Sequence, residues 1–164
     1  MKFTETDISG VFEVTLFHAK DERGSFTKTF HKSSFEANNL ESNFEESFFS
    51  INKKGVIRGM HFQQPPHDHA KLVYASAGKI LDVILDLRES SPTYGKYVEI
   101  EISDENHKAV YMPKGVAHGF CCLSEATMIY LTSTEYSASS ESGILWNSFN
   151  MDWPVESPVL SSRD

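Results

Sequence analysis

Residues 73–87 read VYASAGKILDVILDL, two runs of β-branched and aliphatic residues that Gly78 separates. Runs of this length and composition on either side of a turn residue are typical of two β-strands. We therefore expect one strand on each side of a turn at residues 77–79.

Further strands are expected on the C-terminal side of these two. Residues 97–102 read YVEIEI, and this alternation is typical of a half-buried strand. Residues 109–112 and 127–132 are two more short β-rich runs, so strand signals dominate after residue 50. Turn residues recur about every ten positions, a spacing typical of a sandwich or barrel.

Helical signals are confined to one segment. Only residues 33–39 look helical, with Ser33 or Ser34 as the expected cap and Phe35 facing inward. The chain contains no repeat, low-complexity tract or linker-like change in composition. The sequence therefore predicts one all-β domain spanning residues 1–164, with short peripheral helices.

Composition excludes several function classes. The chain has 164 residues and no apolar run close to the roughly 20 residues that span a bilayer. Charged residues precede any apolar stretch at the N-terminus, so no signal peptide is expected. A net charge of -8 disfavours non-specific nucleic-acid binding. Cys121 and Cys122 are adjacent and are expected to be buried and reduced, which indicates a cytoplasmic protein.

The densest cluster of chemically useful side chains lies at residues 58–71, which read RGMHFQQPPHDHAK. His61 sits between Met60 and Phe62, so strand alternation places it on the face opposite those two apolar side chains. That position favours a functional histidine. His67 and His69 follow two prolines and are expected in an exposed loop.

Two other segments add candidates. Residues 113–120 read PKGVAHGF, a strand-turn-strand pattern in which Pro113 and Gly115 direct His118 toward the interior of the barrel. Tyr130 lies in a strand pattern, where a tyrosine usually belongs to the core with its hydroxyl group satisfied. Asp164 is the last residue, and chain ends usually fray.

These segments together resemble one enzyme family. DERGSF (21–26), VIRGMHFQ (56–63), KLVYASAGKILDVILDLRESSPTYG (71–95), PKGVAHGF (113–120), ILWN (144–147) and the DWP and LSSRD parts of residues 152–164 look like the dTDP-4-dehydrorhamnose 3,5-epimerase family. The resemblance covers nearly the whole chain in order. It implies a cupin-type jelly-roll barrel, a homodimer that exchanges N-terminal strands, a nucleotide-diphosphate keto-deoxy sugar as substrate, and no metal or other cofactor.

The resemblance assigns catalytic roles to four residues. It makes His61 the base, Asp164 its carboxylate partner, Lys71 the cation beside the sugar and Tyr130 the acid. These residue types suit the chemistry, because a neutral imidazole with a pKa of about 6.5 is a suitable base at cellular pH. A cation beside the oxygen that becomes negative contributes about 2.7–4 kcal/mol in comparable sites. A hydroxyl group on the opposite face can return a proton with inversion.

Five further residues are assigned to substrate binding. The family's diphosphate contacts match Arg58 and Arg23, the latter reaching across the dimer, and guanidinium groups suit phosphate oxygens. His118 matches a histidine that lines the pocket, Tyr136 a position near the nucleotide base, and Gln63 a substrate-binding position.

Three features depart from the family pattern. Lys28 stands where the family usually has a glutamate that helps to recognise thymine. Residues 46–49, ESFF, replace a Gln-Asp-Asn-His stretch. The family also usually continues beyond the position of Asp164, and an end residue is harder to hold in place. The nucleotide base, the sugar and the carbons inverted therefore stay open.

Alternative functions remain at this point. A related enzyme could invert only C3 or C5, or act as a ketoisomerase on a different nucleotide sugar. A metal-dependent cupin would use His67, His69 and His118, but Lys71 follows His69 by two residues and no glutamate occurs before Glu89. A non-catalytic sugar-binding cupin is the last alternative, although the base, lysine and tyrosine are all present.

Overall fold

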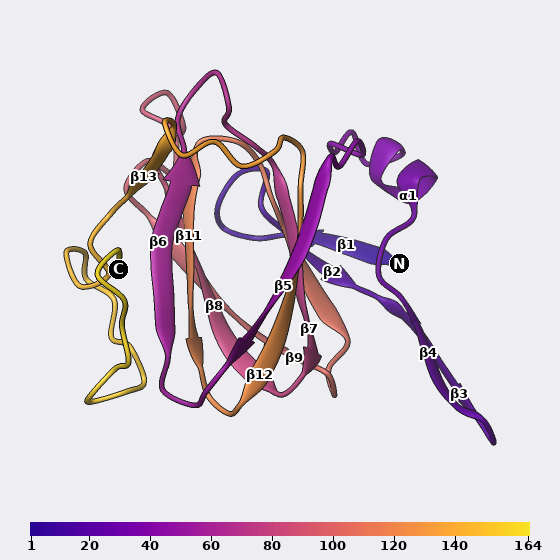
Figure 1. Ribbon diagram of the computed structural model, residues 1–164. Coiled ribbons are helices and arrows are strands. Elements are labelled where there is room, and N and C mark those ends of the chain that lie inside the picture. The colour runs from indigo at the N-terminus through magenta and orange to yellow at the C-terminus, as the bar shows by residue number, and fades with distance from the viewer.

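Two antiparallel sheets form the body of the protein in the computed structural model, which describes residues 1–164 (Figure 1). The six-stranded sheet has the order β1 (Lys2–Glu5), β2 (Phe12–Thr15), β10 (Lys108–Met112), β7 (Lys71–Ala77), β12 (Ala126–Thr132) and β5 (Glu46–Asn52). The five-stranded sheet has the order β13 (Glu141–Gly143), β6 (Ile57–Gln63), β11 (Val116–Cys122), β8 (Lys79–Asp86) and β9 (Tyr97–Ser103). The predicted all-β fold is confirmed.

The turn expected in residues 77–79 carries the chain from one sheet to the other. Strand β7 pairs with β10 and β12, whereas β8 pairs with β11 and β9. Gly78 has a φ of 76°, and a Cβ at this position would lie 1.9 Å from the carbonyl oxygen of Glu125. Only glycine fits this crossing between the sheets.

Buried aliphatic and aromatic side chains fill the space between the sheets. Sixteen residues form the main core cluster, including Val73 of β7, Ile80 of β8 and Met128 of β12. Every residue of β11 is buried, including the free cysteines Cys121 and Cys122, as the sequence predicted. Tyr130 belongs to this cluster, so the core extends to the base of the pocket described below.

The single helix, α1 (Lys32–Glu36), packs outside the six-stranded sheet. Phe35 is fully buried, as predicted, and its ring contacts those of Phe3, Phe30 and Phe44. The predicted serine cap is wrong. His31 occupies the N-cap position without a side-chain capping bond, and its Nδ1 lies 3.0 Å from Ser34 Oγ instead.

Few strand signals precede residue 50, and strands β1, β3 and β4 there are short and mostly exposed. Strands β3 (Phe17–Asp21) and β4 (Gly24–Lys28) pair only with each other and project from the body as a hairpin arm (Figure 1). Phe17 and Phe26 of this arm are exposed. No helix in the structure is long and apolar enough to cross a membrane.

Candidate active site

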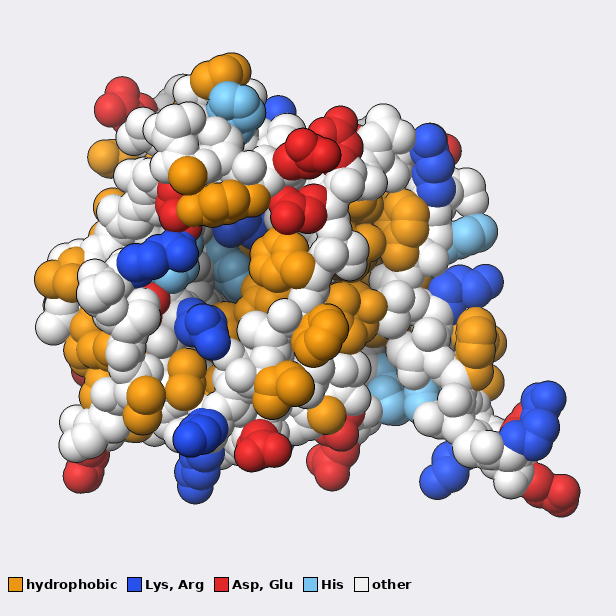
Figure 2. All heavy atoms as spheres, in the orientation of Figure 1, with side chains coloured by type: hydrophobic (Ala, Val, Ile, Leu, Met, Phe, Trp, Pro, Cys, Tyr) orange, Lys and Arg blue, Asp and Glu red, His pale blue; other side chains and the backbone are white.

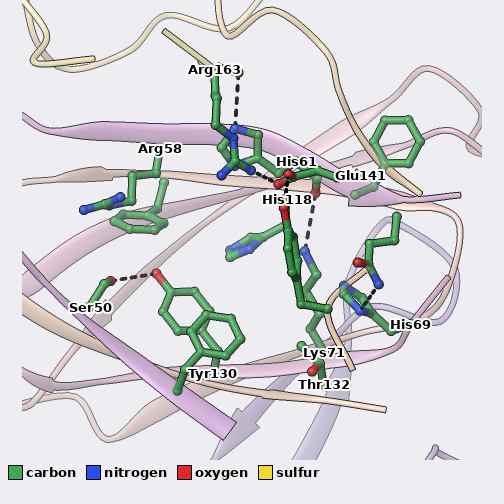
Figure 3. Close-up of a pocket in the computed structure, with 15 residues that line it drawn as sticks. Ser50, Arg58, His61, His69, Lys71, His118, Tyr130, Thr132, Glu141 and Arg163 are labelled. Atoms are coloured by element: carbon green, nitrogen blue, oxygen red, sulfur yellow. Dashed lines mark hydrogen bonds and ion pairs between the residues drawn. The ribbon is translucent and has the colours of Figure 1, made fainter. Parts of the chain in front are cut away.

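A pocket of about 360 Å³ opens between the two sheets, with walls from β5, β6, β7, β11, β12 and β13 (Figure 3). Figure 2 shows basic and histidine side chains gathered in this hollow, although the whole protein is acidic. Seven of the predicted site residues line it: Arg58, His61, Gln63, Lys71, His118, Tyr130 and Tyr136. Asp164 contacts His61, whereas Arg23 lies away from the pocket on the arm.

Strand register explains why these side chains converge. His118 of β11 is the direct cross-strand partner of His61 on β6, so both side chains lie on the inner face. Lys71 of β7 pairs with Thr132 of β12 in the other sheet. Tyr130 is two residues before Thr132 and therefore points to the same inner face.

His61 is held by the C-terminal segment of the chain. Its Nε2 lies 3.1 Å from Asp164 Oδ1 and 3.4 Å from the carbonyl oxygen of Arg163. Both neighbours accept hydrogen bonds, so Nε2 carries the proton, and Nδ1 has no protein partner. Burial lowers the pKa of His61, and the Asp164 carboxylate opposes this effect. The imidazole is therefore neutral at pH 7, with Nδ1 available as a base.

Asp164 is well anchored, unlike the frayed end that the sequence suggested. The backbone N–H of Gly59 donates to Oδ1 at 3.0 Å, and the N–H and hydroxyl groups of Ser161 both donate to Oδ2 at 2.7 Å. Only 3% of the side chain is exposed. Burial alone would raise the pKa of Asp164, but these hydrogen bonds outweigh it and lower the pKa. The carboxylate therefore stays ionised beside His61.

Lys71 lies beside His61 at the inner wall. Its Nζ donates to the carbonyl oxygen of His61 at 3.4 Å. Burial lowers the pKa of Lys71 to about 8, and the charge of Asp82 opposes this effect. The ammonium group is therefore mainly charged at pH 7, in a setting where a nearby oxyanion would be strongly stabilised.

Tyr130 faces His61 from the opposite wall of the pocket (Figure 3). Its hydroxyl group lies 3.1 Å from Ser50 Oγ, and its ring stacks on Phe48 with centroids 4.7 Å apart. Burial raises the pKa of Tyr130 well above its ordinary value. The phenol therefore stays protonated throughout the physiological range and can donate a proton.

Asp82 is a site residue that the sequence interpretation missed. Its Oδ1 accepts a hydrogen bond from His118 Nε2 at 2.7 Å, and the carboxylate is fully buried. This contact fixes the imidazole of His118, which leaves Nδ1 as the nitrogen without a protein partner. A signal was present, because an aspartate inside the apolar run KILDVILDL is rarely buried without a partner.

Gln63 and His69 form a second wall. The amide of Gln63 is engaged by the protein: its oxygen accepts from Ser137 N–H at 2.6 Å, and its nitrogen donates to the His67 carbonyl oxygen at 2.7 Å. His69 was expected in an exposed loop, but it lines the pocket, with Nδ1 3.2 Å from the Gln63 nitrogen. Burial lowers the pKa of His69 to about 3, so this imidazole is neutral.

The rim of the pocket holds arginine, tyrosine and glutamate side chains. Arg58 Nε donates to Asn52 Oδ1 at 2.7 Å, which leaves its terminal nitrogens free. The Tyr136 hydroxyl group donates to Glu141 Oε2 at 2.6 Å, and Arg163 forms an ion pair with Glu141. Arg23 instead pairs with Asp21 at the exposed tip of the arm. No group of three or more His, Cys, Asp or Glu side chains converges in a way that could hold a metal ion.

Comparisons with known proteins point to one enzyme class. The family model described as dTDP-4-dehydrorhamnose 3,5-epimerase matches residues 5–164. A dTDP-4-dehydrorhamnose 3,5-epimerase of Shigella flexneri is 43% identical over 170 residues, which cover 100% of this chain and 93% of the relative. A dTDP-4-dehydrorhamnose 3-epimerase of Streptomyces niveus is 38% identical, covering 100% of this chain and 81% of the relative.

A solved structure agrees with these sequence relatives. The dTDP-6-deoxy-D-glucose-3,5-epimerase of Legionella pneumophila, in complex with dTDP-4-keto-L-rhamnose, superposes with a TM-score of 0.94 and is 34% identical. The match covers 99% of this chain and 89% of that one. The expected cupin-type jelly-roll barrel is thereby confirmed.

Proposed function

The chain belongs to the dTDP-4-dehydrorhamnose 3,5-epimerase family, and we propose that it inverts C3 and C5 of a dTDP-linked 4-keto-6-deoxy sugar in the pocket between its sheets. It is an isomerase of that family. The observation that carries the site assignment is that His61, Lys71 and Tyr130 line one pocket, with His61 and Tyr130 on opposite walls (Figure 3).

The first half of the reaction is proton removal. Nδ1 of His61 takes the proton from the carbon next to the C4 ketone, and the electron pair of that C–H bond moves onto the C4 oxygen. The resulting imidazolium is stabilised by Asp164, which is 3.1 Å from Nε2. The negative charge on the oxygen is stabilised by the Lys71 ammonium group and His118. An enolate is thereby formed without a strong base.

The second half delivers a proton from the other face. The Tyr130 hydroxyl group donates its proton to the same carbon, and the electron pair returns from the C4 oxygen to form the new C–H bond. Base and acid on opposite walls make the outcome an inversion rather than simple exchange. The imidazolium and the phenolate then return to their starting states by exchange with water.

The binding residues suit an anionic nucleotide. Arg58 at the rim offers free guanidinium nitrogens for phosphate oxygens. Tyr136 lies at the same rim and provides an aromatic surface for the base. We further propose a homodimer in which the partner's arm brings Arg23 to this rim, because its guanidinium group is remote from the chain's own pocket.

One alternative has a specific observation in its favour. The S. niveus relative, 38% identical to this chain, is a 3-epimerase, so inversion at C3 alone is the second candidate. No observation favours the metal-dependent alternative, which would need three converging ligands.

The test is incubation of the purified protein in D₂O with dTDP-, CDP-, GDP- and UDP-linked 4-keto-6-deoxy sugars. Proton NMR reads which carbon exchanges and which product forms. We expect exchange and inversion at C3 and C5 of the dTDP sugar. Exchange at C3 only would favour the 3-epimerase, and absence of exchange with every substrate would contradict the proposal.

A further inference from the structure

The C-terminal strap, residues 159–164, carries the carboxylate partner of His61. Val159 bridges to the beginning of β6, where Ile57 N–H donates to its carbonyl oxygen at 3.1 Å. At the other end, two ion pairs join the strap to the body, Asp164 with His61 and Arg163 with Glu141. The Gly59 N–H also donates to Asp164 Oδ1, and His61 Nε2 lies 3.4 Å from the Arg163 carbonyl oxygen. The strap is therefore held on one side by a strand-like bridge and on the other by these contacts, of which the pair of Arg163 with Glu141 is the one made to β13.

Glu141 is placed to act on this strap. It lies on β13 directly opposite Gln63 of β6, and Gly143 of the same strand is opposite His61. Its side chain is 23% exposed, and both carboxylate oxygens are used. The Tyr136 hydroxyl group donates to Oε2 at 2.6 Å, which turns Oε1 toward Arg163. Glu141 thus offers Arg163 a fixed partner.

We propose that Glu141 is a positioning residue, whose ion pair with Arg163 holds the C-terminal strap so that Asp164 stays against His61. This inference rests on the proposed role of His61 as the base. Arg163 provides the link between them, because its side chain pairs with Glu141 while its own carbonyl oxygen lies 3.4 Å from His61 Nε2. One residue therefore couples the rim of the pocket to the catalytic pair.

The effect of this ion pair is expected to be local. Arg163 is 56% exposed, and exposed ion pairs add little to global stability. Loosening the strap would instead lower the fraction of molecules in which Asp164 is aligned. Glu141→Gln and Arg163→Met should both lower kcat at saturating substrate by roughly fivefold, with little change in the unfolding temperature.

A titration of His61 tests the coupling without any substrate. The charged groups that face its imidazole are Asp164, Arg163 and Lys71. In the wild-type background, Asp164→Asn should lower the pKa of His61, measured by NMR, because it removes the charge that raises this pKa. In the Glu141→Gln and Arg163→Met backgrounds, the same Asp164→Asn change should have less than about half that effect. Within each background, the pKa of His61 is compared with and without Asp164→Asn. The direct electrostatic effect of the Glu141 or Arg163 charge on His61 is then the same in both measurements and cancels.

Opposite charge changes separate positioning from a simple field effect. Glu141→Gln removes a negative charge and Arg163→Met a positive one, yet positioning predicts the same loss of coupling in both. The swapped pair Glu141→Arg with Arg163→Glu should recover most of the coupling and of kcat. Glu101→Gln, which breaks the distant ion pair with Lys79, is the matched control and should leave both unchanged.

An equal effect of Asp164→Asn in all backgrounds would overturn the inference. That result is distinguishable from failure of the proposed function, because the titration uses free protein, whereas the proposed function fails only if the wild type does not exchange substrate protons.

Discussion

At the residue scale, burial lowers the pKa of both His61 and Lys71, yet each keeps the charge state that the chemistry needs at pH 7. Burial keeps His61 neutral, since it lowers the pKa below 6.5, while Lys71 keeps its proton until about pH 8. Activity should be lost as the pH falls through the pKa of His61 and again as it rises through that of Lys71. We therefore expect a bell-shaped profile of kcat/KM, with an acid limb below pH 6.5 and a basic limb near pH 8.

Two variants test whether His61 and Lys71 are the groups that cause the acid and basic limbs of this pH profile. Asp164→Asn removes the charge that raises the pKa of His61, so the acid limb should move to lower pH while the rate falls. Lys71→Met should reduce kcat by about 10²–10³ and remove the basic limb. A basic limb that persists in Lys71→Met would show that the group titrating near pH 8 is not Lys71.

Tyr130 supports a separate prediction, because in the proposed mechanism it donates its proton only after His61 has removed the substrate proton. Tyr130→Phe removes the donor and leaves His61 in place, with the stacked Phe48 ring still able to pack on the new side chain. Exchange of the substrate's protons with D₂O should therefore survive better than product formation. Parallel NMR measurements of both rates check this. An equal loss of both would assign Tyr130 a different role.

At the element scale, β6 and β11 approach so closely that only glycine fits between them. A Cβ on Gly59 would lie 2.4 Å from Gly119 Cα, and its φ of 128° is in the region that glycine favours. Gly59 also donates its N–H to Asp164, so the packing of these strands and the position of the catalytic carboxylate are linked.

Gly59→Ala should therefore destabilise the protein by roughly 3 kcal/mol and also reduce activity. Urea unfolding checks the first effect. Gly95→Ala is the matched control: its φ of 73° is also positive, but a Cβ there meets nothing within 4 Å. We expect Gly95→Ala to lower the free energy of unfolding by about 1 kcal/mol. An equal loss of stability in the two variants would contradict the packing argument.

Elements rich in β-branched and aliphatic residues were the predictable ones. β7, β8, β9, β10 and β12 coincide with the runs read from the sequence, because their inner faces are apolar. The short N-terminal strands were not predicted because they bury few side chains, and the predicted serine cap of α1 was wrong because His31 occupies the N-cap position. The pairing of the strands could not be predicted from the sequence, since it depends on contacts between residues far apart in the chain.

The residues of the candidate site likewise fall into some that were predicted from the sequence and others that were missed. His61, Lys71, His118 and Tyr130 were identified from motifs and resemblance, and the fold brings them to one pocket. Asp82, Glu141 and Arg163 were missed, because their importance lies in partners that only the tertiary structure supplies. The roles of all these residues, and the single domain, stay predictions until they are measured.

At the scale of the whole molecule, the arm is the feature that a single chain leaves unexplained. Strands β3 and β4 contact the body little, and the exposed rings of Phe17 and Phe26 lie 6.4 Å apart on the arm. Exposed aromatic side chains that lie together commonly mark an interface. This arrangement supports a dimer in which each arm covers the partner.

Light scattering tests this arrangement. The wild type should have twice the 18.5 kDa mass of one chain. The double variant Phe17→Ser, Phe26→Ser should dissociate and raise KM, because Arg23 would no longer reach the partner's rim. Tyr94→Ser replaces another exposed aromatic residue, outside the arm, and should stay dimeric. A wild-type mass of 18.5 kDa would contradict the dimer.

The whole protein is acidic, whereas the pocket is lined by basic side chains. A protein of net charge -8 must attract a diphosphate locally, and the hollow in Figure 2 gathers the cations that do so around His61. The central claim is that this histidine is the base, and one measurement tests it most directly. His61→Asn should be incubated with the dTDP-linked 4-keto-6-deoxy sugar in D₂O while nucleotide binding is measured by calorimetry. We expect exchange to fall by several orders of magnitude with binding retained, and exchange at the wild-type rate would contradict the account.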